Sequence, residues 1–212
     1  MKITTGNYLK VVHQLPAEGH HIVCHQQNGQ VVVYQAYNSQ IANDALRNQV
    51  LGGSHYSYNR MSWIKPNFLW MMYRCGWASK ENQERVLAIW LNKTDWEAIL
   101  KQAVYSSFNP ARYLNHDQWK QELDQKEVRL QWDPDHDPFG AKLSRRAIQI
   151  GMKGSVLEAY GKQQIKLIED ITDFVKEQKT LIDKGGLGEL RVPDEKVYEI
   201  TDEDLKRSIG VN

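Results

Sequence analysis

Short runs of β-branched and aromatic residues recur along the chain and predict β-strands. Two such runs fill residues 21–37 and flank Asn28-Gly29, a dipeptide that favours a tight hairpin turn because both residues tolerate positive φ. We therefore expect a β-hairpin over residues 21–37. Further strands are expected at residues 61–64, 85–91, 128–133 and 146–152.

Helices are predicted where apolar residues recur at helical spacing behind a capping residue. Asn38 or Ser39 caps the first of these helices. Two capping boxes, in which a Thr or Ser is followed by a Glu at the third position, open helices at Thr94 and Ser155. The apolar stripe behind Ser155 predicts one long helix that reaches Val175. Helices are thus expected over residues 39–46, 66–75, 94–105, 115–123, 155–175 and 201–208.

The order of these elements predicts the fold class. Strands and helices are interspersed, but several connections are too short for crossover helices, so we expect an α+β fold in which helices pack on a mixed, mainly antiparallel sheet. A length of 212 residues suits a single domain. We expect residues 1–19 to be an N-terminal extension, residues 20–183 the single α+β domain, and residues 184–212 a C-terminal segment packed on it.

Charge and composition narrow the classes of function. The 27 Lys and Arg nearly balance the 26 Asp and Glu, which argues against bulk electrostatic binding of nucleic acid but leaves a local basic patch open. The two cysteines are expected to be free thiols. No signal sequence or apolar run of membrane-spanning length is present, so we expect a cytoplasmic protein with no membrane partner. No Gly-rich phosphate loop, HExxH or GxSxG motif occurs, which disfavours classical NTPases, zincins and α/β-hydrolases.

One block, residues 59–77, combines apolar bulk with charge. It holds three of the seven tryptophans, three of the five methionines and the cations Arg60, Lys65 and Arg74. So apolar a segment must be mostly buried, and charges beside a buried wall are unusual. Arginine binds phosphate or carboxylate with two parallel hydrogen bonds, and a Trp such as Trp63 stacks on rings.

The alternative for this block is purely structural. Asp133 or Glu84 would then pair with the cations, and the dipole at a helix C-terminus would by itself account for Arg74. We expect instead that Arg60 and Lys65 line a concavity, with Asn67 beside them, and are not neutralised by protein carboxylates.

Three further places are candidates for a site. The junction Tyr34–Tyr37, which includes Gln35, precedes a helix N-terminus that suits an anion, although a plain turn with core tyrosines explains it as well. Gln131 and Asp133 share one face of a strand, where Asp133 is a candidate base or hydroxyl-orienting group. The last place is Ser144-Arg145-Arg146 before Gln149, where two adjacent arginines at a strand entrance suit an anion or a solvated surface.

Metal binding is not predicted. The loop Asp133–Asp137 carries oxygen and imidazole groups, but its spacing matches neither a zinc nor an EF-hand pattern. An acidic surface loop is the simpler interpretation, and we expect no metal cofactor.

Several segments together resemble the family of the domain of unknown function 4291. The longest is Arg60–Arg74, RMSWIKPNFLWMMYR, and the others are residues 33–37, 41–42, 84–89, 128–134 and 146–151. This resemblance names no activity. A more distant resemblance is to the ADP-ribosyltransferase superfamily, because Tyr34–Leu46 is similar in layout to the strand and helix that cradle NAD there. The chain has no His on that strand, and Gln131-x-Asp133 stands where a Glu-x-Glu or Gln-x-Glu pair is expected.

The leading hypothesis is a soluble nucleotide-binding enzyme that transfers a group from NAD, the candidate cofactor, to a nucleic-acid or protein acceptor. Arg60 and Lys65 would hold phosphates, aided by Asn67, Arg74, Arg146 and Gln149. Gln35, Tyr37 and Trp63 would contact the remainder of the cofactor. Asp133, Gln131 and Tyr34 are the candidate catalytic residues. The alternatives are a non-catalytic module for single-stranded nucleic acid and a protein-interaction domain.

Overall fold

The computed structural model describes residues 2–212, so Met1 lies outside the described residues. Its strands form where β-branched and aromatic residues concentrate. They are β1 (Thr5–Asn7), β2 (Gly19–His20), β3 (Val23–Gln27), β4 (Gln30–Tyr37), β5 (Ser62–Ile64), β6 (Arg85–Asn92), β7 (Ala103–Tyr105), β8 (Val128–His136), β9 (Lys142–Met152), β10 (Ile165–Asp170), β11 (Arg191–Pro193) and β12 (Glu195–Val197).

The helices alternate with these strands along the chain. They are α1 (Tyr8–His13), α2 (Ser39–Asn48), α3 (Phe68–Cys75), α4 (Lys93–Leu100), α5 (His116–Gln125), α6 (Gly154–Ala159), a π-helical turn η1 (Tyr160–Gln164), α7 (Thr172–Asp183) and α8 (Glu203–Ile209). None of the helices in residues 2–212 has the length and apolar character needed to cross a membrane.

The first sheet has the strand order β10-β6-β4-β3-β12 and is antiparallel throughout. The predicted hairpin is confirmed as β3 and β4, and its turn residues have φ values of 50° at Asn28 and 74° at Gly29. The interior strand β6 is buried at every position except its two end residues because both faces of this sheet are covered. That explains why its sequence is a continuous apolar run rather than an alternating one.

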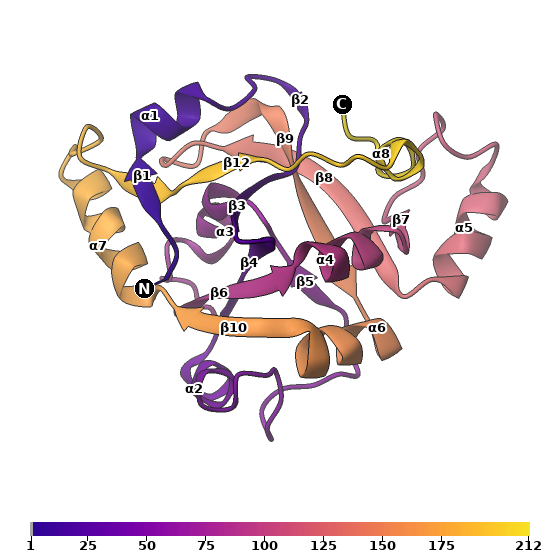
Figure 1. The fold of residues 1–212 in the computed structure, drawn as a ribbon, viewed down its shortest axis with the longest axis horizontal. Coiled ribbons are helices and arrows are strands. Elements are labelled where there is room, and N and C mark those ends of the chain that lie inside the picture. The colour runs from indigo at the N-terminus through magenta and orange to yellow at the C-terminus, as the bar shows by residue number, and fades with distance from the viewer. Residues whose placement is uncertain (1) are drawn as a thin grey trace.

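The second sheet is mixed, with the order β2-β9-β8-β7 and with β5 paired to β9. β8 and β9 are antiparallel, whereas β2 and β7 pair in parallel with their neighbours. β1 and β11 form a separate antiparallel pair. The expected single α+β domain with mixed, mainly antiparallel sheets is therefore confirmed, and Figure 1 shows the helices around these strands.

Two apolar cores lie on the two faces of the first sheet. On one face, Val33 and Ile89 pack with Leu130 and Ile150 of the second sheet. On the other face, β4 and β6 pack against α1, α3 and α7, and this core includes Tyr34, Phe68 and Trp90. Four of the seven tryptophans, Trp70, Trp77, Trp90 and Trp96, are buried.

The predicted long helix over residues 155–175 is wrong. This stretch contains α6, the turn η1, the strand β10 and the start of α7. β10 pairs with β6 over Ile165–Asp170, so an antiparallel edge position in the first sheet replaces the helix. The spacing of apolar residues such as Ile168 and Ile171 is equally compatible with a strand followed by a new helix.

Both predicted capping boxes are also wrong. α4 starts at Lys93 with no side-chain cap and ends at Leu100, after which β7 pairs with β8 instead of continuing the helix. α6 likewise starts before Ser155, whose hydroxyl donates to Glu127 at 2.7 Å. At Ser155, a partner distant in the sequence thus replaces the local cap.

The two ends of the chain both contact the body of the protein. The backbone N–H of Tyr8 donates to Leu190 O at 2.8 Å, and that of Asn212 donates to His20 O at 3.0 Å. Residues 2–19 lie against α7 and β11, and the C-terminal segment crosses the molecule through β12 to α8 (Figure 1). The segments on either side of residues 20–183 therefore share a sheet and a core with it.

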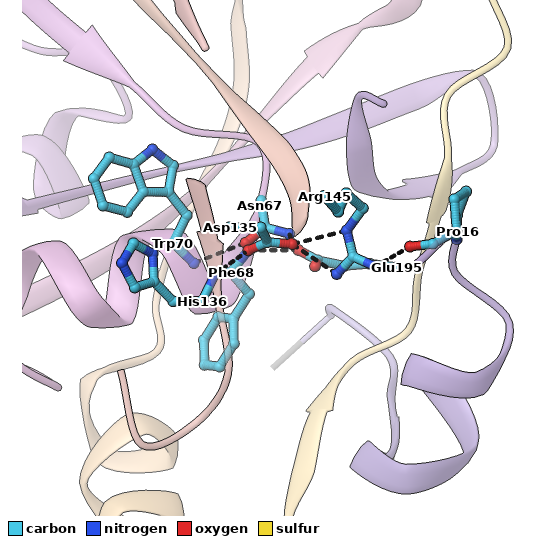
Figure 2. A network of polar contacts seen from close by, with 8 residues as sticks. All are labelled: Pro16, Asn67, Phe68, Trp70, Asp135, His136, Arg145 and Glu195. Atoms are coloured by element: carbon cyan, nitrogen blue, oxygen red, sulfur yellow. Dashed lines mark hydrogen bonds and ion pairs between the residues drawn. The ribbon is translucent and has the colours of Figure 1, made fainter. Parts of the chain in front are cut away.

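A buried polar network joins these segments (Figure 2). The Arg145 guanidinium donates to Asp135 Oδ2 at 2.6 and 2.9 Å and to Pro16 O at 2.6 Å. Asn67 caps α3 by accepting from Trp70 N at 2.7 Å, and its amide lies 3.4 Å from Asp135. Both members of the Asp135–Arg145 ion pair are almost fully buried.

Glu195, from β12, reaches the same network from the C-terminal segment. It accepts from the backbone N–H of Phe68, the first residue of α3, at 2.8 Å. Burial raises the pKa of Glu195 well above its usual value, opposed by the hydrogen bond from Phe68. The start of α3 is therefore held by a side chain that lies more than a hundred residues away in the sequence.

We predict that Arg145→Ala lowers the free energy of unfolding by about 3–5 kcal/mol, because it leaves Asp135 buried without its partner. Urea unfolding followed by circular dichroism measures the change. Arg146→Ala is the matched control, since that neighbouring side chain is exposed, and it should shift stability by less than about 0.5 kcal/mol. Equal stabilities of the two variants would contradict the assignment of the pair.

Candidate functional site

Two backbone hydrogen bonds bring β4 against the chain that follows β5. Tyr34 N donates to Lys65 O at 2.7 Å, and Lys65 N donates to Tyr34 O at 3.3 Å. Since β4 belongs to the first sheet and β5 to the second, Lys65 lies where the two sheets meet. Its side chain lines a cavity although the residue is only 4% exposed.

This cavity, which we call the basic pocket, has a volume of about 630 Å³. Three elements build it: the end of β4 with the start of α2, the loop and strand over residues 55–65, and the outer side of α3 with residues 82–83. Its lining holds Arg60, Lys65 and Arg74, and among the described residues no Asp or Glu lines it. The expectation that Arg60 and Lys65 line one concavity is met.

The three cations of the basic pocket are not neutralised by carboxylates. Within residues 2–212, none of them forms an ion pair, and Arg74 only donates to Gln83 Oε1 at 3.3 Å. The pKa of Lys65 is lowered to about 8, chiefly by burial and also by the nearby Arg74, whereas Asp133 opposes the shift. Such an arrangement favours an anionic ligand.

The carboxylates that the structural alternative invoked are occupied elsewhere. Asp133 accepts from Gln131 Nε2 and Gln149 Nε2, each at 2.7 Å. Glu84 accepts from the backbone N–H of Asn82 at 2.7 Å. Neither one lines the basic pocket.

The junction between β4 and α2 supplies polar groups to the pocket. Gln35 is buried, donates to Ser62 Oγ at 2.9 Å and accepts from the Tyr160 hydroxyl at 2.9 Å, so its orientation is fixed. Asn38 caps α2 by accepting from Ile41 N at 3.0 Å, which confirms the predicted helix start. The first turn of α2 faces the pocket through Asn38 and Ile41, where the positive end of the helix dipole favours an anion.

Aromatic rings complete the wall. Tyr37 and Tyr56 lie edge to face with centroids 6.1 Å apart, and both line the pocket. Trp63 is partly exposed and crosses Gly151 of β9, where a Cβ would lie 2.8 Å from its ring. A side chain at residue 151 would therefore displace Trp63, so the glycine makes room for the indole.

Gln131, Asp133 and Gln149 form a hydrogen-bonded cluster next to the basic pocket and outside its lining. Gln131 and Gln149 are direct partners across β8 and β9, as Trp63 and Gly151 are across β5 and β9. Since strand residues alternate between faces, these side chains and Trp63 share one face of the second sheet. The two amides hold the Asp133 carboxylate in a fixed orientation.

Three predicted site residues lie away from the basic pocket. Tyr34 is fully buried in the core beside Phe68, because alternation along β4 points it away from Gln35 and Tyr37. Asn67 caps α3 and belongs to the buried network. Arg146 lines a different cavity, where it pairs across the sheet with His20 of β2.

The sequence prediction left out several pocket residues. His55, Tyr56 and Ser57 come from the polar, aromatic loop that precedes Arg60, and Gln83 comes from the loop before β6. The loop before Arg60 carries a usable signal, because aromatic and hydroxyl residues are concentrated next to a cation. Gln83 has no such signal, and only the tertiary fold brings it to Arg74.

In the part of the chain that the structure describes, no three His, Cys, Asp or Glu side chains are grouped as a metal site. In a comparison with protein families, a family model described as "Domain of unknown function (DUF4291)" matches residues 21–198. A comparison with curated proteins finds no match.

We predict that affinity for AMP falls as the pH rises through about 8, because Lys65 then loses its proton while the phosphate, with a pKa near ~6, stays dianionic. The loss approaches about tenfold per pH unit above the pKa of Lys65. Calorimetric titrations across this range measure it. Lys65→Met should bind more weakly and with a flat pH profile, whereas Lys166→Met, an exposed control, should behave like the wild type. An unchanged pH profile in Lys65→Met would exclude Lys65 as the titrating group.

Proposed function

The chain belongs to the family of the domain of unknown function DUF4291, and we propose that it is an enzyme that binds a nucleotide in the basic pocket and transfers a group from it, with NAD as the donor. The observation that carries this proposal is the buried amine of Lys65, which lines a pocket of about 630 Å³ with no carboxylate in its lining. A protein buries an uncompensated charge at a cost, and a bound anion offsets that cost.

The cations are suited to phosphate. Arg60 and Arg74 both line the pocket and come from different elements. Arg60 lies in the loop before β5, and Arg74 lies in the last turn of α3. Arginine offers planar pairs of N–H groups, and lysine adds a point charge. Together with the N-terminus of α2 they provide donors for a pyrophosphate.

The aromatic residues are suited to the ring of a nucleotide. Trp63 is partly exposed at the pocket, and its ring packs closely over Gly151. Base–aromatic stacking contributes about 1–3 kcal/mol per base. Gln35, held by Ser62 and Tyr160, also donates to the backbone carbonyl of Trp63 at 3.2 Å and is a fixed polar group beside this residue.

Asp133 is the residue to which the proposal assigns the chemistry. In a transfer from NAD, the acceptor's nucleophilic atom bonds to the anomeric carbon, nicotinamide leaves, and a base takes the acceptor's proton. Asp133 is held by two amides on the sheet face that also carries Trp63. Tyr34 has no direct role in this proposal because its side chain lies in the core.

The protein-interaction alternative has less support. Among residues 2–212, the large hydrophobic side chains that are exposed are Leu9, Tyr73, Leu114 and Phe139, and no tryptophan is among them. A Trp-rich docking surface would require exposed indoles.

We predict that Arg60→Ala weakens NAD binding about tenfold to a hundredfold, because a charge-assisted hydrogen bond contributes about 1.5–3 kcal/mol. Isothermal titration with NAD and with ATP measures the affinity and shows which nucleotide is preferred. The control is Arg207→Ala, an exposed arginine of α8, which should leave the affinity unchanged. Absence of heat with either nucleotide would overturn the nucleotide part of the proposal.

A second prediction concerns the reaction. Asp133→Asn should lower the rate of nicotinamide release from NAD at least tenfold and leave NAD affinity within a factor of about two, because a base acts on the transition state rather than on binding. Chromatographic detection of nicotinamide follows the reaction. A variant that binds NAD and releases nicotinamide at the wild-type rate would remove Asp133 from the mechanism.

A further inference from the structure

A second cavity, of about 670 Å³, borders Leu130, Gln131 and Trp132 of β8. Its walls come from the loop after β7, from β8, from the paired residues His20 of β2 and Arg146 of β9, and from the residue that follows α8. Among the described residues, no Asp or Glu lines it. We call this cavity the aromatic pocket, because Tyr105, Phe108 and Trp132 line it.

The aromatic pocket is electropositive. Arg112 and Arg146 line it, and within residues 2–212 neither forms an ion pair. His20, which also lines it, has a pKa lowered by burial and further lowered by Arg146 and His21. The positive charge that disfavours protonation of His20 favours the binding of an anion in this pocket.

The aromatic rings are held in place by other parts of the fold. Trp132 Nε1 donates to Ile209 O at 2.8 Å, and the Tyr105 hydroxyl donates to the same carbonyl at 2.9 Å. Phe108 stacks on His116 with ring centroids 4.1 Å apart. Rings fixed in this way lose little conformational freedom when a flat ligand binds.

We propose that the aromatic pocket binds an unpaired nucleotide of a single-stranded nucleic acid, with its base against the aromatic rings and its phosphate on Arg112 and Arg146. A carboxylate peptide would use the arginines but would leave the ring walls without a partner. A nucleotide uses both, and Ser106, Asn109 and Gln131 add hydrogen-bonding groups at the base edge. The overall charge of +1 is compatible with this, because the positive charge is local.

The strand β8 links this pocket to the basic pocket. Gln131 lines the aromatic pocket and donates to Asp133, and Asp133 in turn acts electrostatically on Lys65 of the basic pocket. Binding of a single strand does not require the proposed function. A role for the bound strand as the acceptor of the transferred group does rest on that function, with Asp133, the hydrogen-bond partner of Gln131, as the base.

The experiment is fluorescence anisotropy with labelled hexanucleotides of single-stranded RNA and DNA, with a duplex of the same sequence and with poly-glutamate as competitors. Single strands should bind and the two competitors should not displace them. Phe108→Ala should weaken binding about tenfold or more, the effect of losing one stacked base. Arg112→Ala and Arg146→Ala should each weaken it and should lower the slope of log affinity against log salt by about 0.7.

Two controls separate this inference from the proposed function. Arg47→Ala, an exposed arginine of α2, should bind oligonucleotides like the wild type, and so should Arg60→Ala, which is expected to lose only nucleotide affinity. The melting temperature of each variant shows whether it is folded. The inference is overturned if no oligonucleotide binds at low salt, if Phe108→Ala and Arg146→Ala bind as the wild type does, or if the duplex or poly-glutamate competes equally well.

Discussion

The pair of backbone hydrogen bonds between Tyr34 and Lys65 is the constraint on which the site depends. It joins the two sheets at one residue pair and thereby fixes which way the neighbouring side chains point. Tyr34 goes into the core with Phe68, while Lys65 goes into the basic pocket. Because a backbone bridge leaves little freedom to either strand, the amine of Lys65 stays buried beside Arg74 even though burial lowers its pKa. The fold, not local preference, places this charge.

The Asp135–Arg145 pair has the complementary role of holding the outer segments onto the sheets (Figure 2). Arg145 reaches Pro16 near the N-terminus, and Glu195 reaches Phe68 from the C-terminal segment. Burial raises the pKa of Asp135, opposed by Arg145, so the pair adds less stability than its short contacts suggest. What it does provide is a defined position for the start of α3. Since Arg74 and Met71 of α3 line the basic pocket, the buried pair positions the site without touching it.

Sequence reasoning succeeded where a structure is set by neighbours in the chain. The β3–β4 hairpin follows from Asn28-Gly29, and α2 follows from its Asn38 cap, because both signals act within four residues. It failed where a distant partner competes with a local signal. Glu127 takes the hydroxyl of Ser155 that was expected to cap a helix, and β6 takes residues 165–170 as an edge strand. No single-sequence pattern contains these partners, since the competing groups lie elsewhere along the chain.

The candidate site shows the same difference between features that the sequence reveals and features that only the tertiary fold sets. Arg60 and Lys65 could be found from sequence because cations inside an apolar block conflict with burial, and such conflicts concentrate at sites of function. Tyr34 and Arg146 were grouped with them because each was expected near a strand end. Strand alternation points Tyr34 into the core, and Arg146 lines the aromatic pocket instead of the basic pocket. The separation is itself informative. Gln131 lines the aromatic pocket and donates to Asp133, whose charge acts on Lys65 of the basic pocket, so one carboxylate connects two pockets that have no Asp or Glu among their described lining residues.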